Sequence, residues 1–290
     1  MSRWSVSALF GERVRVELRP ASLRLARPAE YPGSRRLDQT IQIEAPEGSS
    51  EYPREPWRAS LDALAAALRD QRGALGGVEV ILSDHFVRYL LVPWSESVVS
   101  DSDRLALARL SFRDVYGHLA DAWDLSVDLQ PAGEASFACA VDRALLSGLR
   151  DVVSRAAGRL ECVKPALADC LNRHRRMLKE QEFCLATAEP GRISLAFRAR
   201  TGWQAVRSRR SEGSLTEALP TLLKQEAVAS SAPDGGVLYL CAANTIELPS
   251  LAVQGWRLIR LAEQRHEVRS ASSPGFAAER IDPRPNLMRE

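Results

Sequence analysis

The sequence predicts an α/β protein built from two related lobes, and two observations support this. A block of hairpin strands, a helix and a buried strand occurs near the start of the chain and again after Phe183. The 290 residues, of which 45% are hydrophobic, are enough for two medium domains with real cores. No apolar run approaches the roughly 20 residues that cross a bilayer, and no signal-peptide pattern follows Met1. We therefore expect a soluble, cytoplasmic protein.

The first block opens with alternating strands. Val14, Val16 and Leu18 alternate with charged residues, as in a strand with one solvated face, and Gly11-Glu12 has the composition of a two-residue hairpin turn. The expected strands are Val6–Phe10, Arg13–Leu18, Ser22–Arg27, Ile41–Glu44, Val78–Leu82, Val87–Val92, Leu125–Leu129, Phe137–Val141 and Leu160–Val163. The expected helices are Trp57–Arg72, one that starts at Asp101 or Ser102 and keeps its apolar period to Leu119, one from the N-cap Asp142 to Gly158, and Pro165–Lys179.

The second block is shorter and ends in a polar tail. Its expected elements are the strands Phe183–Ala186, Ile193–Arg198 and Trp203–Arg207, the helix Leu215–Glu226, and the strands Val237–Cys241 and Leu258–Leu261. We expect a first lobe over residues 1–180, with a small inserted unit over about 84–141 and a linking helix. A second, reduced lobe is expected over 181–265, and a flexible tail over 266–290.

This order of elements resembles the actin-like, or ribonuclease-H-like, fold. Within it the chain looks like the cytoplasmic PilM-type proteins of type IV pili and the GspL-type domain of type II secretion. The segments that carry the resemblance are Phe86–Trp94, Leu105–Tyr116, Phe137–Asp142 and Leu160–Leu167. The resemblance implies a scaffold that supports an inner-membrane assembly. It also implies a groove for a short N-terminal peptide of a membrane partner.

The nucleotide-binding positions of the actin-like pattern are degenerate in this chain. Gly11 lies in the first predicted turn without the expected Asp-x-Gly, and Glu189 and Gly191 flank Pro190, which removes one N–H donor, in the second. Ala242 and Ala243 stand where the family has a glycine-rich adenosine contact. We therefore expect no bound cofactor and a degenerate ATPase rather than an enzyme. A divergent ATPase that uses Glu189 to bind Mg-ATP between the lobes is the alternative.

Other catalytic and metal-binding patterns are not indicated. Ser83, Asp84 and His85 include the residue types of a serine triad, but sequence neighbours do not point together, and a turn is the expected structure. The five cysteines have no CxxC spacing, and no two histidines have metal-ligand spacing. We expect buried thiols in a reducing compartment and no metal site.

Two basic clusters are candidate partner surfaces: Arg173, Arg175 and Arg176, and Arg207, Arg209 and Arg210. Each is either a solvated face or a surface for an acidic partner or anionic lipid headgroups, so the protein would be peripheral to a membrane at most. A nucleic-acid-handling function is a third hypothesis. A net charge of +2 and the lack of interleaved aromatic residues argue against it. The tail segment Ile281–Glu290 is a candidate docking peptide for a partner or for a second copy in a homodimer.

Overall fold

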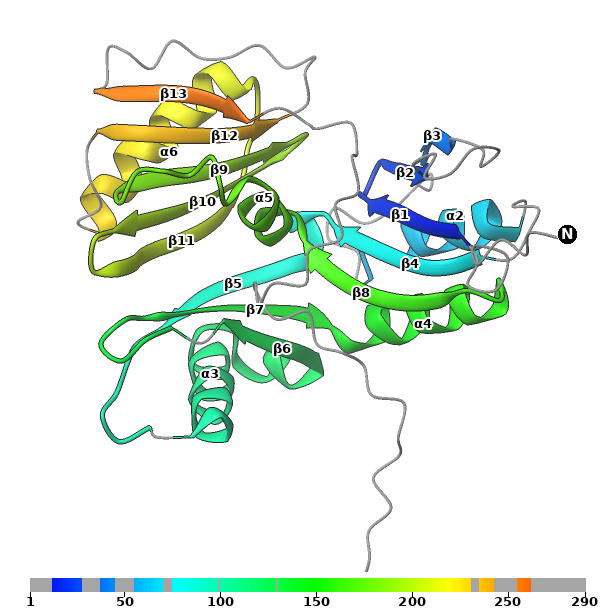
Figure 1. Ribbon diagram of the computed structural model, residues 1–290, viewed down its shortest axis with the longest axis horizontal. Coiled ribbons are helices and arrows are strands. Elements are labelled where there is room, and N and C mark those ends of the chain that lie inside the picture. The colour runs from blue at the N-terminus through cyan, green and yellow to red at the C-terminus, as the bar shows by residue number, and fades with distance from the viewer. Residues whose placement is uncertain are drawn as a thin grey trace, which may run out of the picture.

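The computed structural model describes residues 12–27, 37–44, 55–69, 75–98, 100–128, 130–230, 235–242 and 255–261. They form two five-stranded sheets and one three-stranded sheet, with helices packed against each (Figure 1). The strands are β1 (Glu12–Leu18), β2 (Ser22–Arg27), β3 (Leu37–Gln42), β4 (Leu75–Leu82), β5 (Val87–Val92), β6 (Trp123–Asp128), β7 (Ser136–Asp142), β8 (Arg159–Pro165), β9 (Phe183–Glu189), β10 (Arg192–Ala199), β11 (Gly202–Arg210), β12 (Gly236–Ala242) and β13 (Trp256–Leu261). The helices are α2 (Arg58–Arg69), α3 (Asp101–Tyr116), α4 (Arg143–Arg155), α5 (Ala166–His174), α6 (Leu215–Ser230) and the 3₁₀ turns η1 (Asp84–Phe86) and η2 (Gly117–Ala122).

The first sheet has the strand order β3-β2-β1-β4-β8. The strands β1, β2 and β3 form antiparallel hairpins, whereas β4 and β8 run parallel to β1. Val14, Val16 and Leu18 alternate onto one face of β1, where they are buried with the apolar stripes of α2 and α4. Arg15 and Glu17 point to the opposite face, toward α5, because side chains alternate along a strand.

The second sheet repeats this topology with the order β11-β10-β9-β12-β13. Its first three strands are antiparallel neighbours, and β12 and β13 run parallel to β9. Leu219 and Leu223 of α6 pack on Ile193, Leu195 and Phe197 on one face of this sheet. The same order and the same relative directions confirm the duplicated lobes that the sequence predicts.

The three-stranded sheet, β5-β7-β6, is inserted between β4 and α4. The helix α3 packs on it through Ala108 and Phe112, which are both fully buried. A capping box, in which Ser100 and Asp103 each accept a backbone N–H of the other, sets the start of α3.

A chain of aromatic rings joins the inserted sheet to the second lobe. The ring centroids of Tyr89 and Phe137 lie 5.7 Å apart, those of Phe137 and Trp203 lie 5.5 Å apart, and Trp203 continues to Phe183 at 6.2 Å. Phe183 then contacts Tyr239 at 5.6 Å. The antiparallel pair of β5 and β7 therefore packs on the face of the second sheet opposite α6, as Figure 1 shows for β5 beneath β11. One hydrophobic core contains residues of both lobes.

The first predicted hairpin is wrong in its turn. Glu12 lies in β1 and pairs with Leu75, and β1 pairs with β2 through the turn Arg19-Pro20-Ala21. Pro20 has no N–H to donate to a neighbouring strand, so strand pairing is interrupted there and the chain turns between β1 and β2. The Gly-Glu dipeptide does not mark this turn. Val6–Phe10 and Gly11 lie outside the described residues.

The predicted linking helix Pro165–Lys179 is too long. Pro165 is the last residue of β8 and the N-cap of α5, which ends at His174. Arg175 and Arg176 form a turn after the helix. Leu178 follows this turn and packs on the core, so an apolar residue occurs at helical spacing although the helix has already ended. The domain boundaries stay predictions, and the tail 266–290 lies outside the described residues.

Candidate functional site

The two lobes meet where the carboxyl ends of three strands converge. The arrowheads of β1 and β4 point toward the second lobe, and that of β9 points back toward the first (Figure 1). Ligands of open α/β sheets bind at this end of the strands. Five polar residues from the two lobes, which we call the lobe junction, meet here: Arg19, Ser83, Asp84, Thr187 and Glu189.

Asp84 is the centre of the lobe junction. Its side chain is buried, and it accepts hydrogen bonds from the hydroxyl of Thr187 on β9 at 2.7 Å and of Tyr89 on β5 at 2.5 Å. The backbone N–H of Leu167, in the first turn of α5, donates to the same carboxylate at 3.3 Å. One carboxylate thus connects the first lobe to the inserted sheet, to α5 and to the second lobe. Burial, and next the negative charge of Asp84, raise the pKa of Tyr89 well above its usual range.

Glu189 forms the other contact between the lobes. It accepts a hydrogen bond from the hydroxyl of Ser83, and its carboxylate lies 3.9 Å from the Nε of Arg19. Burial, and next the charge of Asp84, raise the pKa of Glu189 to about 7, although Ser83 and Arg19 act in the opposite direction. The junction therefore contains two carboxylates close together, and Glu189 is held partly protonated near neutral pH.

A second buried polar network lies on the α5 face of the first sheet. Arg15 is 6% exposed and donates to both carboxylate oxygens of Asp169, at 2.6 and 3.3 Å. Arg173 also contacts Asp169 at 2.6 Å, and Glu79 joins Arg15 at 3.2 Å to Lys164 at 2.5 Å. Burial on its own would raise the pKa of Asp169, but Arg15 and Arg173 outweigh it and lower this pKa. The network fixes α5 on the sheet.

The predicted nucleotide-site positions that the structure describes lie at one end of the second sheet, because Ala242 pairs with Ala188, next to Glu189. Gly191 lies in the β9–β10 turn at a φ of 75°, which favours glycine, while Ala242 is buried at the end of β12. Gly11 and Ala243 lie outside the described residues. Of the described positions, Glu189 accepts a hydrogen bond across the lobes, from Ser83.

Several basic residues of the two predicted clusters are engaged by acidic side chains, and the clusters stay predictions as partner surfaces. Arg173 is engaged by Asp169, whereas Arg175 and Arg176 are exposed in the following turn. Arg207 and Arg209 pair with Glu226 of α6 at 3.1 and 3.6 Å. Arg210 lies on the other face of β11 because side chains alternate along the strand.

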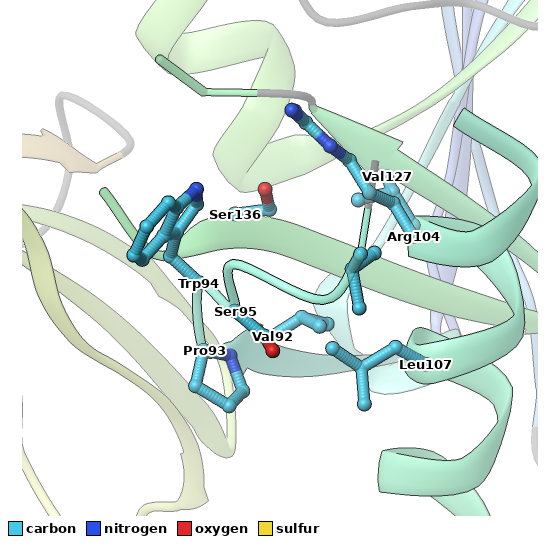
Figure 2. Close-up of a pocket in the computed structure, with 9 residues that line it drawn as sticks. Val92, Pro93, Trp94, Ser95, Arg104, Leu107, Val127 and Ser136 are labelled. Carbon is cyan, nitrogen blue, oxygen red and sulfur yellow. The ribbon is translucent and has the colours of Figure 1, made fainter. Parts of the chain in front are cut away.

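A small recess opens at the end of β5 in the inserted unit. Figure 2 shows Val92, Pro93 and Trp94 on one side of it and Leu107 and Arg104 of α3 on the other. Its volume is about 10 Å³, about the space of one water molecule.

No group of three His, Cys, Asp or Glu side chains that could hold a metal ion occurs among the described residues.

Sequence reasoning treated Ser83-Asp84-His85 as a plain turn and so missed the central carboxylate. The available signal was position: Ser83 and Asp84 follow a buried parallel strand directly, as Arg19 follows β1, and such residues meet at one edge of a sheet. The pairing of this edge with β9 of the other lobe depends on tertiary structure.

The duplicated sheets, joined at the carboxyl ends of their strands and carrying an inserted unit, define an actin-like fold. The structure is similar to the cytoplasmic domain of EpsL, an inner-membrane component of the type II secretion system of Vibrio cholerae, at 18% identity and a TM-score of 0.53 over 87% of this chain and 90% of that one. It is similar to the PilM–PilN type IV pilus biogenesis complex at 14% identity and a TM-score of 0.56 over 87% and 88% of the chains.

A protein of Bacteroides thetaiotaomicron with an actin-like ATPase fold is also similar, at 9% identity and a TM-score of 0.52 over 84% and 86% of the chains. These similarities confirm the resemblance to PilM-type and GspL-type structures that the sequence predicts. No protein-family profile matches the chain, and no curated protein matches it. Within the described ranges no helix is long and apolar enough to span a membrane.

Proposed function

We propose that this protein is a non-catalytic actin-like scaffold of a type IV pilus or type II secretion assembly. It would act through protein–protein contacts at the cytoplasmic face of the inner membrane. The observation that carries the non-catalytic part is the lobe junction, where side chains of the two lobes contact each other directly. The similarity to EpsL and to the PilM–PilN complex supports the assembly role.

The residues at the junction do not fit a magnesium nucleotide. A phosphate chain in an actin-like protein needs backbone N–H groups of glycine-containing turns, but the two facing turns contain Pro20 and Pro190, which lack an N–H. Ser83 and Arg19 contact Glu189 in the space between these turns.

The packing of the second lobe supports a fixed rather than an opening arrangement. Phe137 of the inserted sheet and Trp203 of β11 are 1% and 4% exposed, and their rings are in contact. Separating the lobes would expose this aromatic surface, at roughly 25 cal/mol for each Å². A scaffold that presents one surface to a partner requires no such separation.

The inserted unit carries exposed apolar side chains that fit a protein partner. Trp94 is 39% exposed, and Leu110, Val115 and Leu119 of α3 and η2 are 59 to 60% exposed. Large exposed apolar residues are typical of interaction sites when they occur together on one unit. The partner that the resemblance implies is an inner-membrane assembly protein, bound by a short peptide.

Thermal unfolding with and without millimolar Mg-ATP tests the non-catalytic part. A nucleotide at 100 times its Kd would add about 2.7 kcal/mol of stability, and we expect no shift of the unfolding midpoint. An upward shift that is lost in Glu189→Ala would instead establish the divergent ATPase.

The assembly role is tested by capture from membranes of the source cell with a matched pair of variants. Val115→Glu in the inserted unit should lose the pilus or secretion component that the wild-type protein recovers. Val228→Glu makes the same change at an 89% exposed position on α6 and should retain it. Recovery of no envelope assembly component by the wild-type protein would refute the role.

A further inference from the structure

Two cysteines meet between α5, which is fixed on the first sheet, and the second sheet. Cys170 lies in the middle of α5 and is 2% exposed, whereas Cys241 lies near the end of β12 and is partly exposed. Both side chains pack in the hydrophobic core that contains residues of both lobes. Their thiols are in hydrogen-bond contact, and both are reduced. We call Cys170 and Cys241 the thiol pair.

The position of the thiol pair follows from the lobe junction. The carboxylate of Asp84 accepts from the N–H of Leu167 at the start of α5 and from the hydroxyl of Thr187 on β9. Cys170 lies about one helical turn after Leu167, a rise of about 5 Å. Cys241 is the register partner of Thr187 on the neighbouring strand, and neighbouring strands are about 4.8 Å apart. The two steps away from Asp84 have nearly the same length, in agreement with the contact between the thiols.

The side chain of Cys241 points to the face of the second sheet that α5 covers. Leu238 and Leu240 of β12 pack with α6, whereas Tyr239 and Cys241 pack in the core that contains both lobes, because side chains alternate along a strand. Figure 1 shows α5 against β9, the neighbour of β12, and the two elements are in contact. The thiol pair therefore joins two elements that are far apart in the sequence.

The imidazole of His174 contacts the sulfur of Cys170 one turn further along α5. Nδ1 of His174 lies 3.8 Å from the Sγ of Cys170 and 3.0 Å from its carbonyl oxygen. Because a carbonyl oxygen only accepts, Nδ1 carries the proton and can also donate to this sulfur when it is a thiolate. The contact with Cys241, and next burial, raise the pKa of Cys170 well above its usual range. Cys170 is therefore a thiol at neutral pH, and the partly exposed Cys241 is the member of the pair that a dissolved reagent reaches first.

We propose that the thiol pair is an oxidative modification site, at which a peroxide converts Cys170 and Cys241 into a reversible disulfide between α5 and the second sheet. The thiolate of Cys241 attacks one oxygen of hydrogen peroxide, which forms a sulfenic acid and releases hydroxide. The sulfur of Cys170 then attacks the sulfur of Cys241, and the S–O bond breaks as water leaves with the proton of the Cys170 thiol. In total the two thiols lose two electrons and two protons, and one peroxide becomes two water molecules. The site does not depend on the scaffold role.

The other cysteines provide controls within the same chain. Cys139 and Cys184 are buried, and burial raises the pKa of Cys139 to about 12. Cys162 is partly exposed, as Cys241 is, but its thiol contacts a carboxylate oxygen of Glu79 at 3.6 Å. Cys162→Ser therefore removes another partly exposed thiol without changing the thiol pair.

The test is treatment of the whole reduced protein with hydrogen peroxide, followed by alkylation of the remaining thiols and mass spectrometry of the peptides without reduction. We expect one cross-linked pair of peptides that contains Cys170 and Cys241, lighter by two hydrogen atoms and separated again by dithiothreitol. Cys162→Ser should give the same cross-link in the same yield. Cys241→Ser and, separately, Cys170→Ser should lose it.

Three results would overturn the proposal. The first is oxidation of Cys241 to a sulfinic or sulfonic acid while Cys170 is recovered as an unmodified thiol. The second is a cross-link between two copies of the chain, visible as a dimer on a non-reducing gel, in place of one within a chain. The third is an equal loss of thiols in Cys241→Ser and in the wild-type protein. Cys241→Ser changes a partly exposed position, so the comparison holds even if Cys170→Ser fails to fold, and circular dichroism verifies each variant.

Discussion

Glu189→Gln should stabilise the protein above neutral pH and have little effect in mild acid. Burial and the charge of Asp84 raise the pKa of Glu189 from 4.5 to about 7, which corresponds to about 3 kcal/mol at about 1.4 kcal/mol for each pH unit. The folded state binds the proton more tightly than the unfolded state, so stability decreases as the pH rises from 4.5 to 7. Glutamine removes this cost and keeps an oxygen that accepts from Ser83.

The assay is urea unfolding of the wild-type protein and the variant at pH 5 and pH 8, followed by tryptophan fluorescence. We expect the advantage of the variant in free energy of unfolding to grow by about 2 kcal/mol between these values. Glu212→Gln, on an exposed loop, is the control and should show no such growth. His85 has the opposite trend, because a pKa lowered from 6.5 makes stability fall as the pH falls through this range. His85 is present in both proteins, so its contribution cancels.

One result would refute this reasoning. If the wild-type protein were more stable than Glu189→Gln at pH 8, the ionised carboxylate would be stabilised by Arg19 more than it is destabilised by burial and Asp84. The junction would then hold a favourable ion pair between Arg19 and Glu189, and Glu189 would be ionised at neutral pH.

Three further predictions concern packing and buried groups. Trp203→Ala should cost about 3–5 kcal/mol of unfolding free energy, because it removes the ring that joins the inserted sheet to the second lobe, and calorimetry should show an earlier transition of one lobe. Asp169→Asn should lower the free energy of unfolding, measured by urea titration, by about 3–5 kcal/mol, because it leaves the buried charge of Arg15 without its main partner. An unchanged urea midpoint would mean that Glu79 alone is enough to stabilise the charge of Arg15. Cys139 and Cys162 should resist thiol reagents at pH 8 in the native protein, because burial raises their pKa to about 12 and about 11, and rapid labelling of either would contradict the described burial.

The sequence by itself determined the local elements and the duplication. Alternation in β1 and the 3.6-residue period in α2 and α4 reflect one buried face each, so these elements were predictable within a few residues. The repeat of strands and helix implied two lobes of one topology, which the strand orders confirm. Asp142 was recognisable as an N-cap because its side chain satisfies a local N–H, that of Ala144.

Only the tertiary structure decided which polar residues meet. Asp84 and Thr187 are 103 residues apart in sequence. Their hydrogen bond forms because the aromatic rings of the inserted sheet pack against the second lobe and so position it. The split of Arg207 and Arg209 from Arg210 likewise follows from the pleat of β11 and from the position of Glu226 on α6. Periodicity reports which face of an element is buried, but it carries no information about the partner across that face, because hydrophobic packing is non-directional.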